Sequence, residues 1–158
     1  RPDDHTAAGS LSPDGRKEQS IDFKRMIHAI HGAAKREDPF SIYGYMGYSI
    51  HTYDDEEVTY PGVLNRCDTC HVDDSYELPL VSTALATTVD SDPMAATKAE
   101  STQATLQDPS DDLNISPTTS VCSACHDTLL AKSHMAQNGG AFSVTQGQID
   151  DIADPEDF

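Results

Sequence analysis

The sequence predicts one domain of mainly irregular structure with short α-helices, extending over residues 1–158. Two observations lead to this prediction. Apolar residues make up 37% of the chain, which is below the usual range for a soluble globular domain. There is no Trp, and only four Phe are present. Because large apolar side chains are scarce, we expect loops to dominate and side chains alone to fill the interior poorly.

One helix is predicted near the N-terminus. Residues 1–20 are polar and contain two prolines, so we expect an extended lead-in there. Ser20 has the character of a helix N-cap, and Asp22 falls in the first turn. Pro39 ends the helix at the latest. The apolar stripe of this helix has helical spacing and consists of Phe23, Met26, Ile27 and Ile30.

The rest of the chain alternates between short ordered segments and loops. Residues 40–62 are rich in Tyr and Gly and predict a short strand or an irregular aromatic segment. Residues 82–119 are dominated by Ser, Thr, Ala, Asp and Pro and predict a long surface loop. Apolar residues at 129–131 predict a short helix, which residues 138–140 (Asn-Gly-Gly) break. Residues 148–158 predict an acidic, mobile tail.

The charge of the chain limits its partners. The formal net charge is −17, which argues against nucleic acids and anionic membrane surfaces, because their phosphates would be repelled. It favours a soluble protein with basic partners, or a protein from a high-salt habitat. No stretch of the sequence approaches the length of a transmembrane helix.

The four cysteines form two pairs, and a His directly follows each pair, at residues 67–71 and 122–126. The pattern C-x-x-C-H is the attachment signature of c-type haem. Two thiols with this spacing can both add to the vinyl groups of one porphyrin, and the next residue then faces the iron. We therefore predict two covalent haems c that form the core of the domain. The haem-binding residues are Cys67, Cys70, Cys122 and Cys125, and the proximal iron ligands are His71 and His126.

Three other interpretations of the cysteines are weaker. A four-thiolate zinc site usually has its pairs separated by about 15–20 residues, whereas the segment between these pairs is much longer and very polar. A thioredoxin-like redox motif needs a βαβ context, which the sequence lacks. A disulfide framework in an exported protein leaves both trailing histidines unexplained.

The second axial ligand of each iron is expected to be a His. His28 and His31 share one face of the predicted helix. His134 follows His126 too closely to wrap around the same porphyrin, so we expect it to ligate the haem at residues 67–70. One member of the His28/His31 pair then serves the haem at residues 122–125. The other is left for a third haem, which either another chain or a further part of the same protein would carry. The surplus of His favours bis-His iron with a low potential; His5 and His51 are weaker candidates.

Several segments resemble the outer-membrane decahaem cytochromes of the OmcA/MtrC type. The similar segments are residues 22–31, 58–71, 76–80 and 122–135. The resemblance implies part of a pentahaem-type domain, in which short helices and irregular chain surround stacked bis-His haems. It also implies that His28, His31 and His134 are distal ligands. Proteins of this type pass electrons to minerals, flavins, electrodes or partner cytochromes.

The function predicted from the sequence is electron transfer by a dihaem c-type cytochrome. Because bis-His coordination leaves no open iron site, we expect an electron carrier rather than an enzyme. The expected partners are other multihaem cytochromes, copies of the same chain, or extracellular electron acceptors. The alternatives are a subunit of a polymeric cytochrome filament, or a small haem reductase or peroxidase with one open iron. Covalent haem attachment and the resemblance both imply the periplasm or the cell surface.

Overall fold

The computed structural model describes residues 20–43, 49–56, 58–78, 80, 84–94 and 107–153. Within these ranges the chain forms four short α-helices, two short 3₁₀ helices and two antiparallel sheets of two strands each. This mixture of short elements and irregular chain confirms the fold class in outline. The predicted lead-in lies outside the described residues up to position 19, and His5 with it.

Helix α1 (Phe23–His31) begins two residues later than the sequence indicates. The side chain of Asp22, rather than Ser20, caps it by accepting a hydrogen bond from Lys24 N at 3.1 Å. The Ser20 hydroxyl oxygen instead accepts a hydrogen bond at 3.2 Å from the backbone N of the cap residue, Asp22. The helix ends at His31 with Gly32 as its C-cap, and the 3₁₀ helix η2 (Ala33–Lys35) continues the chain.

Only part of the apolar stripe expected from the sequence, Met26 and Ile30, packs against the core between α1 and α3 (Pro117–Cys125). Arg25 and Ala29 are buried there, whereas the Phe23 side chain is 71% exposed. The apolar core is small, as the composition predicts. Its centre is formed by Ala29, Phe40 and Ala124, and the partly buried side chains packed against it are Met26, Ile30, Ile42 and Tyr53.

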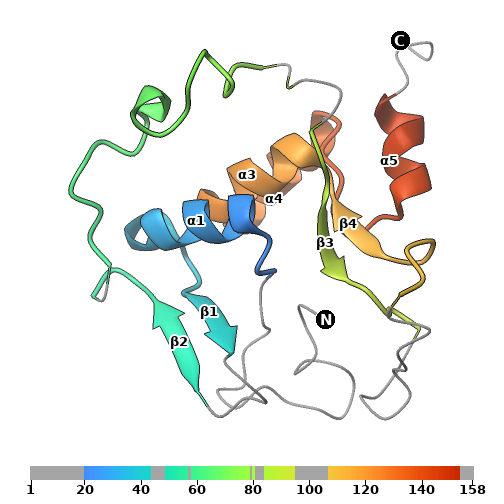
Figure 1. Ribbon diagram of the computed structural model, residues 1–158, viewed down its shortest axis with the longest axis horizontal. Helices are drawn as coiled ribbons and strands as arrows, with labels where there is room; N and C mark the ends of the chain where they lie inside the picture. Colours follow the sequence, from blue (N-terminus) through green and yellow to red (C-terminus); the bar gives the residue numbers. More distant parts are fainter. Residues whose placement is uncertain are drawn as a thin grey trace.

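The first sheet follows α1 and η2 in the chain. Strand β1 (Phe40–Tyr43) pairs antiparallel with β2 (Ile50–Tyr53), so that Phe40 lies opposite Tyr53. The short strand predicted in the Tyr- and Gly-rich segment is therefore present in part, and residues 44–48 lie outside the described chain. The segment after β2 makes a wide arc around the outside of the helices (Figure 1).

The second sheet lies where the sequence predicts a surface loop. Strand β3 (Thr87–Asp90) pairs antiparallel with β4 (Leu113–Ile115), with an irregular register between Thr88 and Asp90. The β-branched side chains at 87–89 favour this pairing, and the Thr88 hydroxyl donates to Asn114 Oδ1 at 2.9 Å. The prediction of a loop over residues 82–119 is thus wrong at both ends, where the structure has β3, β4 and the start of α3. Residues 95–106 lie outside the described chain.

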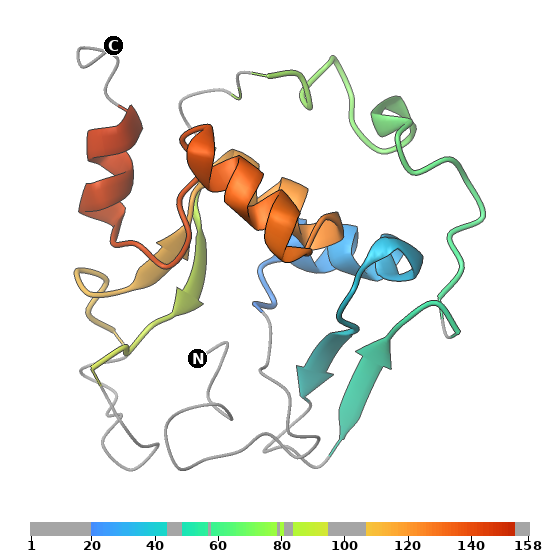
Figure 2. The ribbon, with the colours of Figure 1, turned by 180° about the vertical axis from the view of Figure 1, so that it is seen from behind.

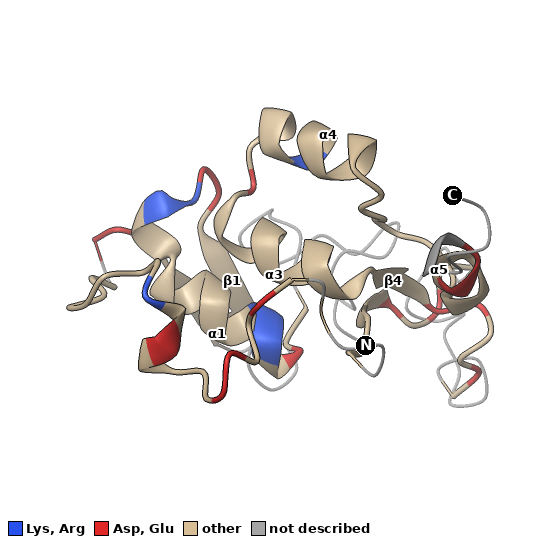
Figure 3. Ribbon diagram, turned by 90° about the horizontal axis from the view of Figure 1, so that it is seen from above, with Lys and Arg blue, Asp and Glu red and all other residues tan. Residues whose placement is uncertain are grey.

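The C-terminal part is more helical than expected. Helix α4 (Leu129–Gln137) lies behind α3 in Figure 1 and in front of it in Figure 2, and Figure 3 shows it on the side of α3 away from α1. It ends at Asn138, as the Asn-Gly-Gly sequence predicts. Helix α5 (Gln146–Ala153) occupies the start of the predicted acidic tail. Among the described residues, no helix has the length and apolar character needed to cross a membrane.

Candidate functional site

The second C-x-x-C-H motif lies at the C-terminal end of α3. Pro117 occupies the first helical turn, where its missing N–H costs no hydrogen bond. The helix ends at Cys125, and His126 N closes it by donating to Cys122 O at 2.9 Å. Cys122 and Cys125 are half-buried, and this burial raises the pKa of both thiols. The side chain of His126 is exposed.

A buried carboxylate directly after this motif fixes the neighbouring chain. Asp127 accepts hydrogen bonds from Glu37 N at 2.8 Å and Asp38 N at 3.1 Å, and it pairs with Arg36 Nη2 at 3.2 Å. The side chains of Arg36 and Asp127 are only 1% and 2% exposed. Burial raises the pKa of Asp127, but the two backbone N–H groups and the Arg36 charge outweigh it and hold the pKa below its ordinary value. Arg36 Nη1 also donates to Ala124 O.

A second buried guanidinium lies against the same helix. Arg25 Nη1 donates to Ser120 O at 3.2 Å and to Ser123 Oγ at 2.9 Å. Burial, followed by the charge of Arg36, lowers the pKa of Arg25 to about 10, so the group stays protonated at neutral pH. The periodicity of the sequence does not predict that Arg25, Arg36 and Asp127 are buried, because the partner that buries each of them is distant in the sequence.

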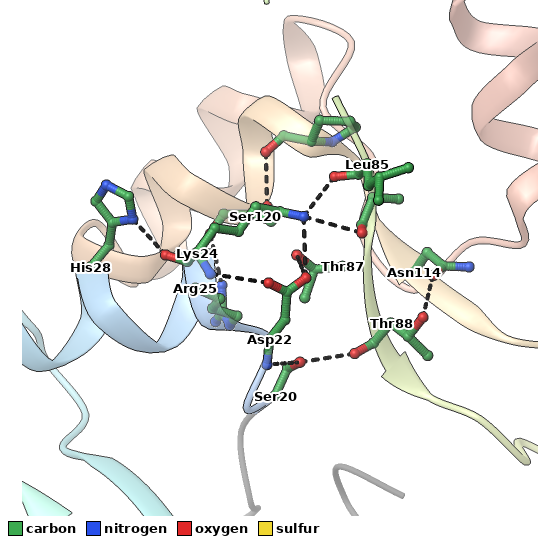
Figure 4. A network of polar contacts seen from close by, with 12 residues as sticks. Ser20, Asp22, Lys24, Arg25, His28, Leu85, Thr87, Thr88, Asn114 and Ser120 are labelled. Carbon is green, nitrogen blue, oxygen red and sulfur yellow. Dashed lines mark hydrogen bonds and ion pairs between the residues drawn. The ribbon is translucent and has the colours of Figure 1, made fainter. Parts of the chain in front are cut away.

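A polar network holds the start of α1 against β3 (Figure 4). The Lys24 ammonium donates to Leu85 O at 2.6 Å and pairs with Asp22 Oδ2 at 3.1 Å. The Thr87 hydroxyl donates to the same Asp22 oxygen at 3.0 Å. The N-terminus of α1 is thus hydrogen-bonded to β3 and the residues before it, while the buried face of α1 packs on α3.

The C-terminal end of α1 contacts the second motif directly. The Cys125 thiol donates to His28 O with an Sγ–O distance of 3.4 Å. A Cβ atom added at Gly32 would lie 2.6 Å from Cys125 Sγ, which is closer than real Cβ atoms approach. Glycine is therefore required at this position for the two helices to reach their observed separation.

The first motif lies on an exposed turn. Its cysteines belong to the 3₁₀ helix η4 (Cys67–Thr69) and its C-cap Cys70, and both are exposed. His71 N donates to Cys67 O at 2.9 Å, and the His71 ring lies half-buried with Nδ1 3.4 Å from Ser75 Oγ. The first motif therefore lies on a short 3₁₀ turn rather than on a longer α-helix.

His28 of α1 lies beside His71 of the first motif. The two ring centroids are 6.0 Å apart, and the ring planes are inclined by 25°. His28 Nδ1 lies 2.5 Å from Lys24 O, which places the ring proton on Nδ1 and a lone pair on Nε2. Metal-bound histidines commonly have this hydrogen bond to a backbone carbonyl. With metal–nitrogen bonds of about 2 Å, two imidazoles that bind one iron have centroids about 6 Å apart, which is the separation of these two rings.

The other candidate histidines lie elsewhere. The His31 ring is 5.0 Å from the ring of Tyr60, centroid to centroid. His134 is exposed on α4, and its Nδ1 lies 3.4 Å from Asn138 Nδ2. His51 is exposed on β2. The contact of the first motif with His28 differs from the pairing expected from the sequence, in which His134 serves that motif.

Exposed apolar side chains border both motifs. Each C-x-x-C-H segment offers two thiols and one imidazole, which are the protein groups that attach haem c and bind its iron. A porphyrin attached there would cover apolar surface that soluble proteins rarely leave in contact with water. The side chains concerned are Val63 (60% exposed), Leu64 (40%), Val72 (74%) and Leu78 (66%) near the first motif, and Leu129 (80%) and Leu130 (81%) after the second. In the described part of the chain, no three His, Cys, Asp or Glu side chains gather as a metal site by themselves.

Residues 3–155 match the family described as outer membrane cytochrome MtrC/MtrF-like, domains II/IV. The chain belongs to this family. The resemblance inferred from the sequence is thereby confirmed, and this cytochrome is an extracytoplasmic, cell-surface protein of electron transport that uses haem c. No curated protein and no solved structure matches the chain.

Proposed function

We propose that this cytochrome carries two haems c with bis-His iron and relays electrons at the cell surface without catalysing a reaction of its own. The observation that carries the proposal is the 6.0 Å separation of the His28 and His71 rings, together with the His28 Nδ1 hydrogen bond to Lys24 O. Haem c held in this way supplies a one-electron Fe(III)/Fe(II) couple. Two axial imidazoles exclude substrate from the iron, which suits electron relay rather than bond chemistry.

Each residue of the first motif has a separate task in this proposal. Cys67 and Cys70 would anchor the porphyrin through thioethers, and His71 and His28 would supply the imidazoles that bind its iron. The Lys24 carbonyl keeps His28 in the tautomer that offers Nε2 to the metal. The half-buried position of both rings limits the access of water to the iron.

At the second motif, Cys122 and Cys125 would anchor the porphyrin, and His126 would be the iron ligand that the motif itself supplies. We assign its distal ligand to His31, because the next residue, Gly32, packs against Cys125 Sγ. His134 then remains for a haem carried by another chain. Its exposed position on α4 supports a role in contact with other multihaem cytochromes or further copies of this chain.

The first experiment is a pyridine haemochrome assay of the haem-loaded chain, with iron counted per polypeptide before and after acid-acetone extraction. Two haems c that resist extraction support the proposal. A colourless or zinc-containing protein refutes it. Rapid binding of carbon monoxide by the reduced protein would instead indicate an open iron and favour a small reductase or peroxidase.

The distal ligand is tested by His28→Ala, with His51→Ala as the matched control on the exposed strand β2. We expect His28→Ala to convert one of the two haems from a low-spin to a high-spin spectrum, with two haems still attached. His51→Ala should leave both spectra unchanged. Loss of low-spin character at one haem in His134→Ala, but not in His28→Ala, would refute the assignment.

One observation favours a second candidate, a subunit of a cytochrome filament. His134 lies on the same helix as the exposed Leu129 and Leu130, so a potential iron ligand and apolar surface occur together on α4. Light scattering of the haem-loaded chain separates the two candidates. A monomer at micromolar concentration supports the relay, and a polydisperse series of oligomers that His134→Ala abolishes supports the filament.

A further inference from the structure

The residues directly after the first motif fold back on the imidazole of His71. The Ser75 hydroxyl oxygen lies 3.4 Å from His71 Nδ1. The ring of Tyr76 meets the imidazole edge-on, with the two centroids 6.0 Å apart and the planes inclined by 69°. Ser75 is exposed, and Tyr76 is half-buried. This short segment therefore gives the imidazole of the motif a hydroxyl and an aromatic ring as neighbours.

A tight turn at residues 72–75 brings these two side chains back to His71. Ser75 N donates to Val72 O at 3.1 Å. Asp73 and Asp74 are the central residues of the turn, and both have positive φ, at 51° and 56°. These are features of a type I′ turn, whose central positions favour Gly, Asn and Asp. Because such a turn reverses the chain, residues 75 and 76 return toward the motif.

The backbone of this turn has a conformation that residues with a side chain seldom adopt. A non-glycine residue with positive φ is uncommon, and here two of them are adjacent. Strained backbone of this kind occurs often where function depends on the exact placement of a side chain. The side chain that the turn places is Ser75, at the ring nitrogen of an expected iron ligand.

The tautomer of an iron-bound imidazole decides what the Ser75 hydroxyl can do there. When Nε2 of an imidazole binds a metal, the remaining proton is on Nδ1, so Nδ1 can only donate a hydrogen bond. The hydroxyl oxygen is then the acceptor. An acceptor at Nδ1 fixes the orientation of the ring and makes the imidazole a stronger ligand. Stronger donation to the iron favours Fe(III) over Fe(II), which lowers the potential.

Building on the proposed function, we propose that Ser75 is the positioning residue of His71. Its hydroxyl accepts the hydrogen bond from Nδ1, holds the imidazole in place for the iron and lowers the potential of the haem at the first motif. Only an electron is exchanged at the iron, and the proton stays on Nδ1 in both oxidation states. The other imidazole of this pair has a backbone partner, because His28 Nδ1 lies against the Lys24 carbonyl. A substitution can therefore remove the partner of His71 and leave that of His28 intact.

The experiment is a redox titration of the haem-loaded full chain, followed by visible absorption, with the haem count and spin state measured on each sample. Ser75→Ala should raise one of the two midpoint potentials, leave the other in place and keep both haems low-spin. Ser75→Thr retains the hydroxyl and should return that midpoint most of the way to its original value. The matched control is Ser110→Ala, which removes another exposed hydroxyl, one that donates to Asp108 Oδ1 at 2.6 Å. It should move neither midpoint.

A second pair of variants tests the turn. Asp74→Asn and Asp74→Val remove the same charge, but Asn tolerates a φ of 56°, whereas a β-branched residue does not. Asp74→Val should therefore raise the same midpoint further than Asp74→Asn does. With two haems bound, the inference is overturned if Ser75→Ala raises neither midpoint, if Ser75→Thr behaves like Ser75→Ala, or if the two Asp74 variants have equal potentials. A chain with no covalent haem refutes the proposed function itself, so the two failures are distinguishable.

Discussion

Breaking the buried pair between Arg36 and Asp127 should destabilise the domain more than any exposed charge substitution. In Asp127→Asn the Arg36 guanidinium, 1% exposed, loses a carboxylate 3.2 Å away and remains a charge in the interior. Removing one partner of such a pair typically costs about 3–5 kcal/mol. The asparagine oxygen can still accept from only one of the two backbone N–H groups that Asp127 now binds. We therefore expect the free energy of unfolding to fall by about 3–5 kcal/mol.

The measurement is urea unfolding of the haem-loaded protein, followed by far-UV circular dichroism. Asp68→Asn is the matched control, because its pair with Arg66 is exposed and should be worth less than about 1 kcal/mol. Adding Arg36→Met to Asp127→Asn should recover part of the loss, since the buried guanidinium that has lost the Asp127 carboxylate is then gone. A loss in Asp127→Asn no larger than in Asp68→Asn would refute the reasoning.

Three further changes test other parts of the structure. Gly32→Ala places a Cβ 2.6 Å from Cys125 Sγ, so we expect urea unfolding to show a loss of about 1–3 kcal/mol, whereas Gly147→Ala, with open space around it, should show none. Thr128→Ala removes the side chain that caps α4 by accepting from Ala131 N at 3.1 Å, and should cost about 1 kcal/mol and speed amide exchange in α4. Burial, followed by the charge of Asp111, raises the pKa of Asp112, so its ionised form opposes folding. Stability should therefore fall as pH rises from about 4 through the raised pKa, and Asp112→Asn should flatten that fall.

Each of these three predictions has an outcome that contradicts it. If Gly32→Ala is as stable as Gly147→Ala, then α1 and α3 are farther apart than described. Unchanged amide exchange in Thr128→Ala would mean that the cap does not hold α4. A steeper fall of stability with pH in Asp112→Asn than in the original protein would show that the ionised Asp112 has a favourable partner.

The elements that depend on local sequence were predictable, and those that depend on distant contacts were not. The spacing of Met26 and Ile30 is sufficient to predict a helix, and Asn138 with the following glycines is sufficient to end one. The β3–β4 pair was missed because Thr and Asp in a low-complexity segment resemble loop composition. The two strands are far apart in the sequence, so no local sequence pattern predicts that they pair.

The same distinction applies to the site. The two C-x-x-C-H motifs are local patterns and could be found by inspection. The approach of His28 to His71 depends on how the segment after β2 folds back, so helical periodicity leads equally to His28 or His31. Arg25 was missed for a different reason. A charged residue between apolar ones is normally assigned to the solvent face, whereas Arg25 is buried against α3 and donates to the Ser120 carbonyl and the Ser123 hydroxyl.

The close packing of Gly32 on Cys125 has a consequence for the order in which the protein matures. In the folded chain Cys67 and Cys70 are exposed, so an attachment enzyme could reach them after folding. Cys125 is half-buried, with its Sγ 3.4 Å from the His28 carbonyl oxygen and close to Gly32, so a porphyrin edge should reach that sulfur more easily before α1 packs against it. Biogenesis should therefore follow one sequence, in which ligation at residues 122–125 comes first and helix docking follows. A chain that folds before it meets the attachment machinery would be trapped with a single cofactor.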